Sequence, residues 1–96
     1  MNVIASYKDP DAKRLLDGRE RIKKYPPEIL QTARRKLVML DAAPSLQSLR
    51  VPPGNRLEKL TGNRDGQHSI RINDQYRICF VWDNGNAYDV EITDYH

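Results

Sequence analysis

A run of two prolines followed by a glycine, Val51-Pro52-Pro53-Gly54, interrupts the chain of 96 residues near its middle. Proline fixes its own backbone φ angle and lacks an N–H donor, so neither a helix nor a central strand is expected to continue through this segment. Apolar residues recur at helical spacing before the break and alternate as in strands after it. The chain is therefore expected to form its helices first and its sheet second.

The residues before the break predict one long helix and one short helix. From Glu28 to about Ala43, apolar residues recur at spacings of four, four and three, which places them on one face of an amphipathic helix. These residues are Ile29, Ala33, Leu37 and Leu40. The cations Arg34-Arg35-Lys36 fall between them and are expected to reach solvent or a partner. The shorter helix is predicted to begin at Pro10, with Asp9 as its N-cap, and to end at Gly18.

Three weaker patterns complete this half of the chain. Val3 to Tyr7 predicts a short opening strand, and Ser45 to Arg50 predicts a helical turn. The stretch from Arg19 to Lys24 is basic, relieved only by Glu20 and Ile22. Such a stretch forms either a solvated surface or a binding site for an anionic partner, and the sequence leaves both open.

The second half of the chain is rich in strand patterns. Four segments of strand-like sequence are separated by turn residues, which predicts an antiparallel meander. They run from Arg56 to Leu60, from His68 to Ile72, from Tyr76 to Trp82 and from Ala87 to Ile92. The predicted fold class is α+β: a small antiparallel sheet with the N-terminal helices packed on one face, in a single domain that spans residues 1–96.

The turn at Asp83-Asn84-Gly85 decides which side chains of the last two strands face the core. A two-residue Asn-Gly loop would put Phe80 opposite Asp89, which mixes apolar and polar side chains on one face. A three-residue loop keeps that face apolar, with Phe80 opposite Tyr88 and Ile78 opposite Val90. The three-residue loop is therefore predicted. On the polar face it gives the pairs Arg77–Glu91 and Cys79–Asp89.

A second loop of three residues, Asn73-Asp74-Gln75, sets the register of the preceding strand pair. It puts Arg71 directly opposite Arg77, with Ile70 opposite Ile78 on the other face. Two exposed arginines that face each other across a strand pair repel by up to ~1 kcal/mol. Guanidinium groups match phosphate oxygens with paired donors, so a bound phosphate would relieve the repulsion. The alternative is a solvated pair of charges that Glu91 and Asp89 compensate.

Composition narrows the possible partners and the compartment. Lys and Arg number 16 against 13 Asp and Glu, which gives a net charge of +3 and a pI near 9.2, compatible with an anionic partner. One cysteine, Cys79, and two histidines exclude an internal disulfide and a Cys-rich zinc site. No secretion signal and no apolar run of membrane length are visible. The expected location is the cytoplasm, with no membrane contact, metal or cofactor.

Asp94-Tyr95-His96 bring an acid, a phenol and an imidazole together after the last predicted strand. Termini fray unless a strand or a docking helix holds them, so a strand that leads into this triplet favours residues positioned for proton transfer. The alternative is that Tyr95 and His96 form a disordered tail.

Two longer motifs and this triplet together resemble one toxin family. The motifs are Pro52–Glu58, PPGNRLE, and Gly62–Phe80, GNRDGQHSIRINDQYRICF. With the ending Asp94-Tyr95-His96 they are similar to the HigB-type toxins, the proteic killer branch of the RelE toxin superfamily. The resemblance covers nearly half of the chain, and the helical half agrees with it in order and length.

The resemblance implies an mRNA interferase, the toxin of a type II toxin–antitoxin pair, with a fold like that of small microbial RNases. Such a protein enters the ribosomal A site and cuts the mRNA exposed there. The RNA 2′-hydroxyl would attack the adjacent phosphate and leave a cyclic phosphate and a free 5′-hydroxyl. The implied partners are a helix-turn-helix antitoxin similar to HigA, the 70S ribosome and mRNA, with operator DNA bound only through the antitoxin.

Residue roles follow from the same resemblance. Arg71 and Arg77 would stabilise the charge that develops on the phosphate oxygens. His96 and Tyr95 are the candidates for proton transfer, and Asp94 would orient or tune them. The remaining candidates would hold the RNA backbone or the ribosome, and they are Arg56, Lys59 and Arg64.

One part of the family pattern is missing. Many members carry a histidine before the glycine-flanked loop and a lysine just ahead of its first glycine, where this chain reads Glu58-Lys59-Leu60-Thr61-Gly62. More of the acid–base chemistry would then fall on His96, Tyr95 and the arginines, and cleavage would be slow or context-dependent. The alternative function is a module of the same fold that binds the ribosome or the antitoxin without efficient cleavage.

Overall fold

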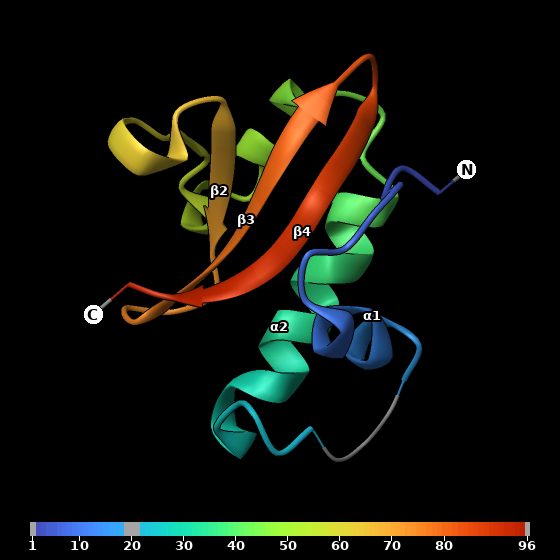
Figure 1. Cartoon of the computed structure of the whole chain (residues 1–96), viewed down its shortest axis with the longest axis vertical. Helices are drawn as coiled ribbons and strands as arrows, with labels where there is room; N and C mark the ends of the chain where they lie inside the picture. Colours follow the sequence, from blue (N-terminus) through green and yellow to red (C-terminus); the bar gives the residue numbers. More distant parts are fainter. Residues whose placement is uncertain (1, 19–21, 96) are drawn as a thin grey trace.

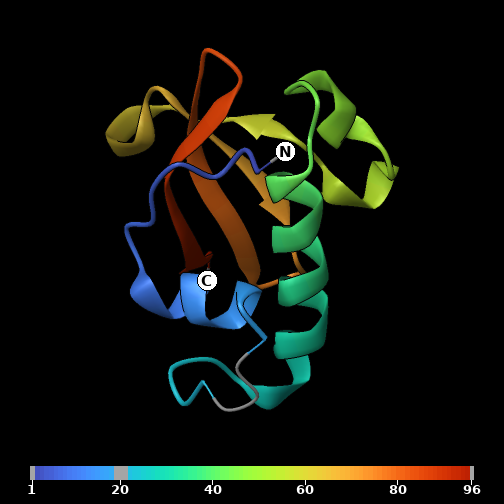
Figure 2. The same cartoon turned by 90° about the vertical axis from the view of Figure 1, so that its right-hand side faces the viewer.

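The computed structural model describes residues 2–18 and 22–95. Helices α1 (Pro10–Leu16) and α2 (Pro27–Asp41) come first, and 3₁₀ turns follow at Gln47–Arg50, Pro53–Asn55 and Gly62–Arg64. The strands are β1 (Glu58–Lys59), β2 (Gln67–Arg71), β3 (Tyr76–Asp83) and β4 (Asn86–Asp94). They form an antiparallel sheet in the order β1-β2-β3-β4, with α1 and α2 on one side of it (Figure 1 and Figure 2). The predicted α+β arrangement is confirmed.

Both predicted helices form where their end signals place them. The side chain of Asp9 caps α1 by accepting a hydrogen bond from the Asp11 N–H at 3.0 Å, and Pro10 is the first helical residue. Gly18, with φ +92°, follows α1 in the left-handed conformation that glycine adopts at low cost. The long helix begins at Pro27 and ends at Asp41, two residues before the predicted end.

The apolar face predicted for α2 supplies the helical side of the core. Its four predicted members are all buried, and they are Ile29, Ala33, Leu37 and Leu40. They share one apolar cluster with Ile70, Ile78 and Phe80 from the sheet. Truncating a fully buried leucine such as Leu37 to alanine lowers the free energy of unfolding by roughly 2–5 kcal/mol. The packing of this face therefore contributes strongly to holding α2 against the sheet.

Lys36 corrects the prediction that the three cations of α2 reach solvent or a partner. Arg34 and Arg35 are exposed, but the side chain of Lys36 is buried and donates a hydrogen bond to Asn55 Oδ1 in the loop before β1. Lys36 lies three residues after Ala33 and four before Leu40, so the helical period places it at the margin of the buried face. The loop that carries Asn55 packs over that margin.

The register between β2 and β3 agrees with the prediction. Arg71 lies opposite Arg77, and Ile70 lies opposite Ile78. The three-residue loop between these strands is held by Asn73, whose Oδ1 accepts hydrogen bonds from the backbone N–H groups of Gln75 and Tyr76, each at 2.8 Å.

The turn between β3 and β4 differs from the prediction. It is a two-residue loop, Asn84-Gly85, with positive φ at both residues. A bulge in β4, where Asp89 has φ +54°, then inserts an extra residue opposite Phe80. The bulge returns Ile92 to the core face opposite Ile78, so this face stays apolar by a different route. The four predicted pairs are wrong, and the observed pairs include Arg77–Thr93, Cys79–Glu91 and Val81–Tyr88.

The two edges of the sheet are short or covered. β1 keeps two residues of the predicted strand 56–60, because Arg56 has a left-handed backbone with φ +44°. Along β4, the predicted strand Val3–Tyr7 appears as two isolated parallel bridges, Ile4 with Ala87 and Tyr7 with Val90. Short or covered edges do not offer a template for pairing with other chains.

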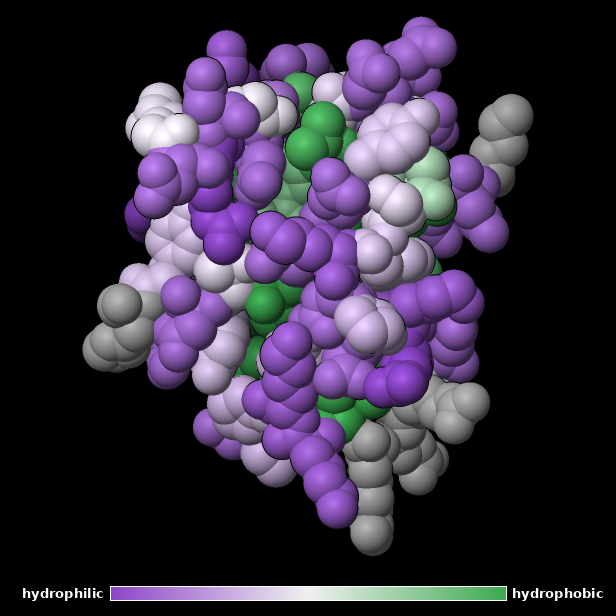
Figure 3. Space-filling view, viewed as in Figure 1, coloured by the Kyte–Doolittle hydropathy of each residue, from purple (hydrophilic) through white to green (hydrophobic). Residues whose placement is uncertain are grey.

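The surface is largely hydrophilic on the side drawn in Figure 3, with small hydrophobic patches between polar side chains. In the part of the chain that the structure describes, no helix is long and apolar enough to cross a membrane.

Candidate active site on the polar face of the sheet

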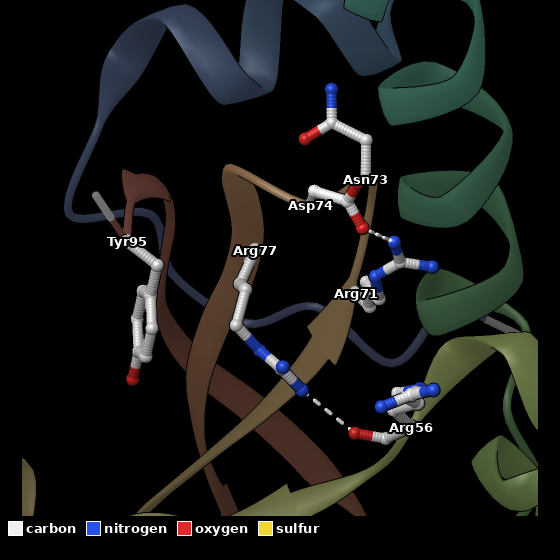
Figure 4. Close-up of a pocket in the computed structure, with 6 residues that line it drawn as sticks. All are labelled: Arg56, Arg71, Asn73, Asp74, Arg77 and Tyr95. Atoms are coloured by element: carbon white, nitrogen blue, oxygen red, sulfur yellow. Dashed lines mark hydrogen bonds and ion pairs between the residues drawn. The ribbon is translucent and has the colours of Figure 1, made fainter.

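The face of the sheet turned away from the helices carries the predicted arginine pair. Successive residues of a strand point to opposite faces, so Arg77 and Arg71 lie opposite the core residues Ile78 and Ile70. A pocket of about 260 Å³ opens there. Its lining comes from the loop before β1, from the β2–β3 hairpin and from the end of the chain (Figure 4), and consists of Arg56, Arg71, Asn73, Asp74, Arg77 and Tyr95.

Arg77 is the most firmly held group of the pocket, with 9% of the residue exposed. Its Nε donates a hydrogen bond to Ser69 Oγ at 2.8 Å, and its Nη2 donates one to the carbonyl oxygen of Arg56 at 2.7 Å. Its Nη1 lies 3.6 Å from a carboxylate oxygen of Glu58. These partners on β1, β2 and the preceding loop fix the plane of the guanidinium group before any ligand binds.

Arg71 is held more loosely than Arg77. It is half-buried, and its Nη2 pairs with the carboxylate of Asp74, a fully solvated residue of the hairpin loop. An ion pair with an exposed partner is weak, so an incoming phosphate competes with Asp74 at little cost. Arg56 is exposed at the pocket rim. The pocket therefore joins one fixed and two adjustable guanidinium groups, a donor set that suits a phosphodiester.

Tyr95 lies on the other side of Arg77 from Arg56 and Arg71 (Figure 4). Its backbone N–H donates a hydrogen bond to the Gln75 carbonyl oxygen at 2.6 Å. The Cζ atom of Arg77 lies 5.7 Å from the centre of the Tyr95 ring, in reach of a cation–π interaction. Burial raises the pKa of Tyr95 against the opposing effect of Arg64 and Arg77. The phenol therefore keeps its proton at neutral pH and has one to donate.

The structure does not bring all the predicted site residues into this pocket. Asp94, in β4, accepts a hydrogen bond from Gln75 Nε2 at 3.1 Å and is not among the lining residues. Arg64 lies over the same polar face, where its Nη1 donates to Gln67 Oε1 at 3.0 Å and lies 3.4 Å from Glu91 Oε2. Lys59 in β1 lies opposite His68 in β2, whereas the neighbouring residue Glu58 lies opposite Ser69. Because successive residues of a strand point to opposite faces, Lys59 belongs to the other face of the sheet. His96 lies outside the described residues, as do Arg19 and Arg21 of the basic stretch.

Four residues of the site were not predicted from the sequence. Ser69 and Glu58 hold Arg77, and Asn73 and Asp74 line the pocket. The register offered a signal for Ser69, since it lies two residues from Arg71 on the same face. The predicted three-residue loop Asn73-Asp74-Gln75 offered a signal for Asn73 and Asp74, since it follows Arg71 closely in the chain. Nothing local in the sequence signals Glu58, whose approach to Arg77 requires the pairing of β1 with β2.

Among residues 2–18 and 22–95, no group of three or more His, Cys, Asp or Glu side chains is placed to hold a metal ion. Cys79, buried beneath the polar face, has its thiol pKa raised by burial and is a poor nucleophile.

Comparisons with known proteins agree with this fold and sequence. The structure is similar to the toxin–antitoxin complex YoeB-YefM from Staphylococcus aureus, with a TM-score of 0.53 and 18% identity over 97% of each chain, a likeness of fold. The family model described as the RelE-like toxin of type II toxin–antitoxin system HigB matches residues 5–96. Toxin HigB-1 of Vibrio cholerae serotype O1 is 43% identical over 85 residues, which cover 88% of this chain and 90% of that protein. An uncharacterised protein of Haemophilus influenzae is 36% identical over 64 residues, 67% of this chain and 63% of that protein.

The family model and the relative from Vibrio cholerae therefore define a toxin of the RelE type. More particularly, the chain belongs to the HigB family of RelE-like toxins of type II toxin–antitoxin systems.

Proposed function

We propose that this toxin is an endoribonuclease that cuts mRNA on the ribosome, acting in the cytoplasm as a single domain. The observation that carries the proposal is the arginine pair of β2 and β3, which shares one pocket with Tyr95. An anionic phosphate between Arg71 and Arg77 would relieve their mutual repulsion. Single-stranded RNA with unstacked bases, as presented in the ribosomal A site, can reach an open pocket of this kind.

The reaction needs positioning, charge stabilisation and two proton transfers. The RNA O2′ forms a bond to phosphorus and the P–O5′ bond breaks, which gives a 2′,3′-cyclic phosphate and a 5′-hydroxyl. The negative charge that grows on the nonbridging oxygens is stabilised by Arg77, whose orientation is fixed before binding, and by Arg71 once it leaves Asp74.

His96 is the proposed base that accepts the 2′-hydroxyl proton, because histidine titrates near neutral pH. Tyr95 is the proposed acid that donates a proton to the leaving 5′-oxygen, since it lines the pocket beside Arg77 and a phenol carries its proton at neutral pH. Asp94 would orient the triplet through its place in β4. Arg56 and Arg64 would hold the RNA backbone, and Lys59, on the other face, would contact the ribosome.

The proposed partner in the resting state is an antitoxin. The structural relatives from Staphylococcus aureus are complexes of a toxin with its antitoxin, and the family is that of type II systems. For this chain we infer a helix-turn-helix antitoxin similar to HigA, through which operator DNA would be bound.

The experiment that tests the function is mRNA cleavage by the purified protein with and without programmed ribosomes, beside a His96→Ala variant. The expected result is cleavage only with ribosomes, and loss of cleavage in the variant. Ribosome binding without any cleavage by the native protein would contradict the enzymatic function and favour a binding module.

A further inference from the structure

The loop before β1 links helix α2 to the candidate active site. Asn55 is fully buried, and its side chain accepts a hydrogen bond from Lys36 Nζ and donates one to the Leu49 carbonyl oxygen at 3.1 Å. The next residue, Arg56, has φ +44°, and its carbonyl oxygen accepts a hydrogen bond from Arg77 Nη2 at 2.7 Å. A continuous series of contacts therefore runs from α2 to the guanidinium group of the pocket.

Two members of this series, Lys36 and Arg56, are costly for the fold. Burying an ammonium group is unfavourable unless strong partners compensate it, and burial lowers the pKa of Lys36, with the charges of Arg35 and Arg71 adding to the shift. A left-handed backbone is unfavourable at a residue other than glycine, as at Arg56. An apolar side chain at position 36 would be sufficient for core packing alone. Costs of this kind concentrate at functional sites, where geometry matters more than stability.

Two hydrogen bonds fix the orientation of Arg77, and their acceptors lie in different parts of the fold. Ser69 Oγ in β2 accepts from Nε, and its position is set by the sheet. The Arg56 carbonyl accepts from Nη2, and its position is set by the loop that Asn55 anchors. Release of the loop would free the Nη2 edge of the guanidinium group and leave the Nε edge in place.

We propose that Lys36 and Asn55 are positioning residues for Arg77. They hold the backbone of residues 55–56 so that the Arg56 carbonyl turns the guanidinium edge of Arg77 toward the scissile phosphate. The inference rests on the proposed cleavage reaction. It assigns a role in that reaction to a buried lysine of α2 that is not among the residues lining the pocket.

A test that does not depend on activity is ¹⁵N NMR of the arginine guanidinium groups, with the Arg77 signals assigned by their loss in Arg77→Lys. The variants are Lys36→Met and Asn55→Ala, and the control is Lys23→Met, which removes an exposed lysine outside the series. In the native protein and the control, the Nη signals of Arg77 are expected to be resolved because a hydrogen bond slows rotation about the Cζ–Nη bond. In the two variants they should average, while the Nε signal held by Ser69 persists and shows that the sheet is intact.

The kinetic arm uses the same proteins on programmed ribosomes. Misplacement of a catalytic group by a small distance is expected to lower kcat about ten-fold, with KM for the ribosome changed by less than about two-fold. Lys36→Met leaves the other contacts of Asn55 in place, so it keeps the test open if Asn55→Ala does not fold.

Resolved Arg77 Nη signals in both folded variants, or a loss of activity that appears only as loss of folded protein, would overturn the positioning role. If the native protein cuts no mRNA, the proposed function fails. The NMR comparison then still decides whether Lys36 and Asn55 orient Arg77.

Discussion

Arg77 and Arg71 face each other across two strands, but their surroundings differ. Arg77 is bound to Ser69, to the Arg56 carbonyl and to Glu58, whereas Arg71 is paired with the solvated Asp74. A preorganised donor contributes more to a charged transition state than one that must first rearrange. The two arginines are therefore expected to contribute unequally to the proposed cleavage reaction.

The matched substitutions Arg77→Lys and Arg71→Lys test this inequality. Lysine keeps the charge but cannot form the separate contacts of the guanidinium group, so Arg77→Lys is expected to lower kcat about 10²-fold. Arg71→Lys should lower it about ten-fold or less. The measurement is single-turnover cleavage on programmed ribosomes, and equal losses in the two variants would contradict the assignment.

Tyr25 is a second residue whose surroundings predict a measurable effect. It is buried, and its hydroxyl donates a hydrogen bond to Asp9, the N-cap of α1, which Lys24 also approaches at 3.2 Å. Burial, with the bond to Asp9 and nearby carboxylates adding, raises the pKa of Tyr25 above its ordinary value. The folded protein therefore favours the neutral phenol more than the unfolded chain does.

The free energy of unfolding is expected to fall as pH rises above about 10, where the unfolded tyrosine starts to lose its proton while the folded one keeps it. Tyr7, whose pKa burial raises to about 12, contributes in the same direction. Urea unfolding at pH 8 to 11 measures the slope. Tyr25→Phe should flatten it, and an unchanged slope in that variant would show that Tyr25 does not couple folding to pH.

At the scale of single elements, the β3–β4 hairpin is the part of the fold that most clearly requires an unusual backbone conformation. Its two-residue turn sets one register, and the bulge at Asp89 shifts it so that Ile92 meets Ile78 in the core. Asp89 is exposed and has φ +54°, a conformation that β-branched residues adopt only with strain.

Substitutions at Asp89 should therefore follow backbone preference. Asp89→Val is expected to destabilise the protein by roughly 1–2 kcal/mol, and Asp89→Gly should be close to neutral. Urea unfolding of the two variants at neutral pH gives the difference. A valine variant as stable as the glycine variant would show that the bulge does not need the left-handed conformation.

The same hairpin shows where prediction from sequence reaches its limit. The periodicity of Ile29 to Leu40 identified the buried face of α2, and the length of the loop at Asn73 placed Arg71 opposite Arg77. Both are local patterns. The bulge at Asp89 could not be predicted, because a two-residue turn with a bulge and a three-residue turn both place Val90 and Ile92 on the apolar face. Burial of Lys36 was also missed, since it depends on a loop that returns from residue 55.

At the scale of the whole molecule, the N-terminal segment closes the open edge of the sheet. Backbone hydrogen bonds link residues 3–8 to β4, from Ala5 N–H to the Ala87 oxygen at 2.7 Å and from Lys8 N–H to the Val90 oxygen at 3.0 Å. Val3 is buried in the core. The segment thus both covers a strand edge and contributes to packing.

Removal of residues 2–8 is expected to expose the edge of β4, lower the melting temperature by several degrees and promote self-association. Thermal unfolding and size-exclusion chromatography of the truncated chain check both effects. Asn2→Ala, which changes only an exposed residue at the start of the removed stretch, serves as the control. A truncated protein that stays monomeric with an unchanged melting temperature would contradict this role.

The central claim is that the polar face cuts mRNA through the RNA 2′-hydroxyl. Ribosomes programmed with mRNA that carries a single 2′-deoxy nucleotide at the scissile position test it directly. We predict that the all-ribose mRNA is cut to a 2′,3′-cyclic phosphate and a 5′-hydroxyl, and that the deoxy mRNA stays intact although the toxin binds both ribosome complexes equally. Cleavage of the deoxy mRNA at the same position would contradict the account.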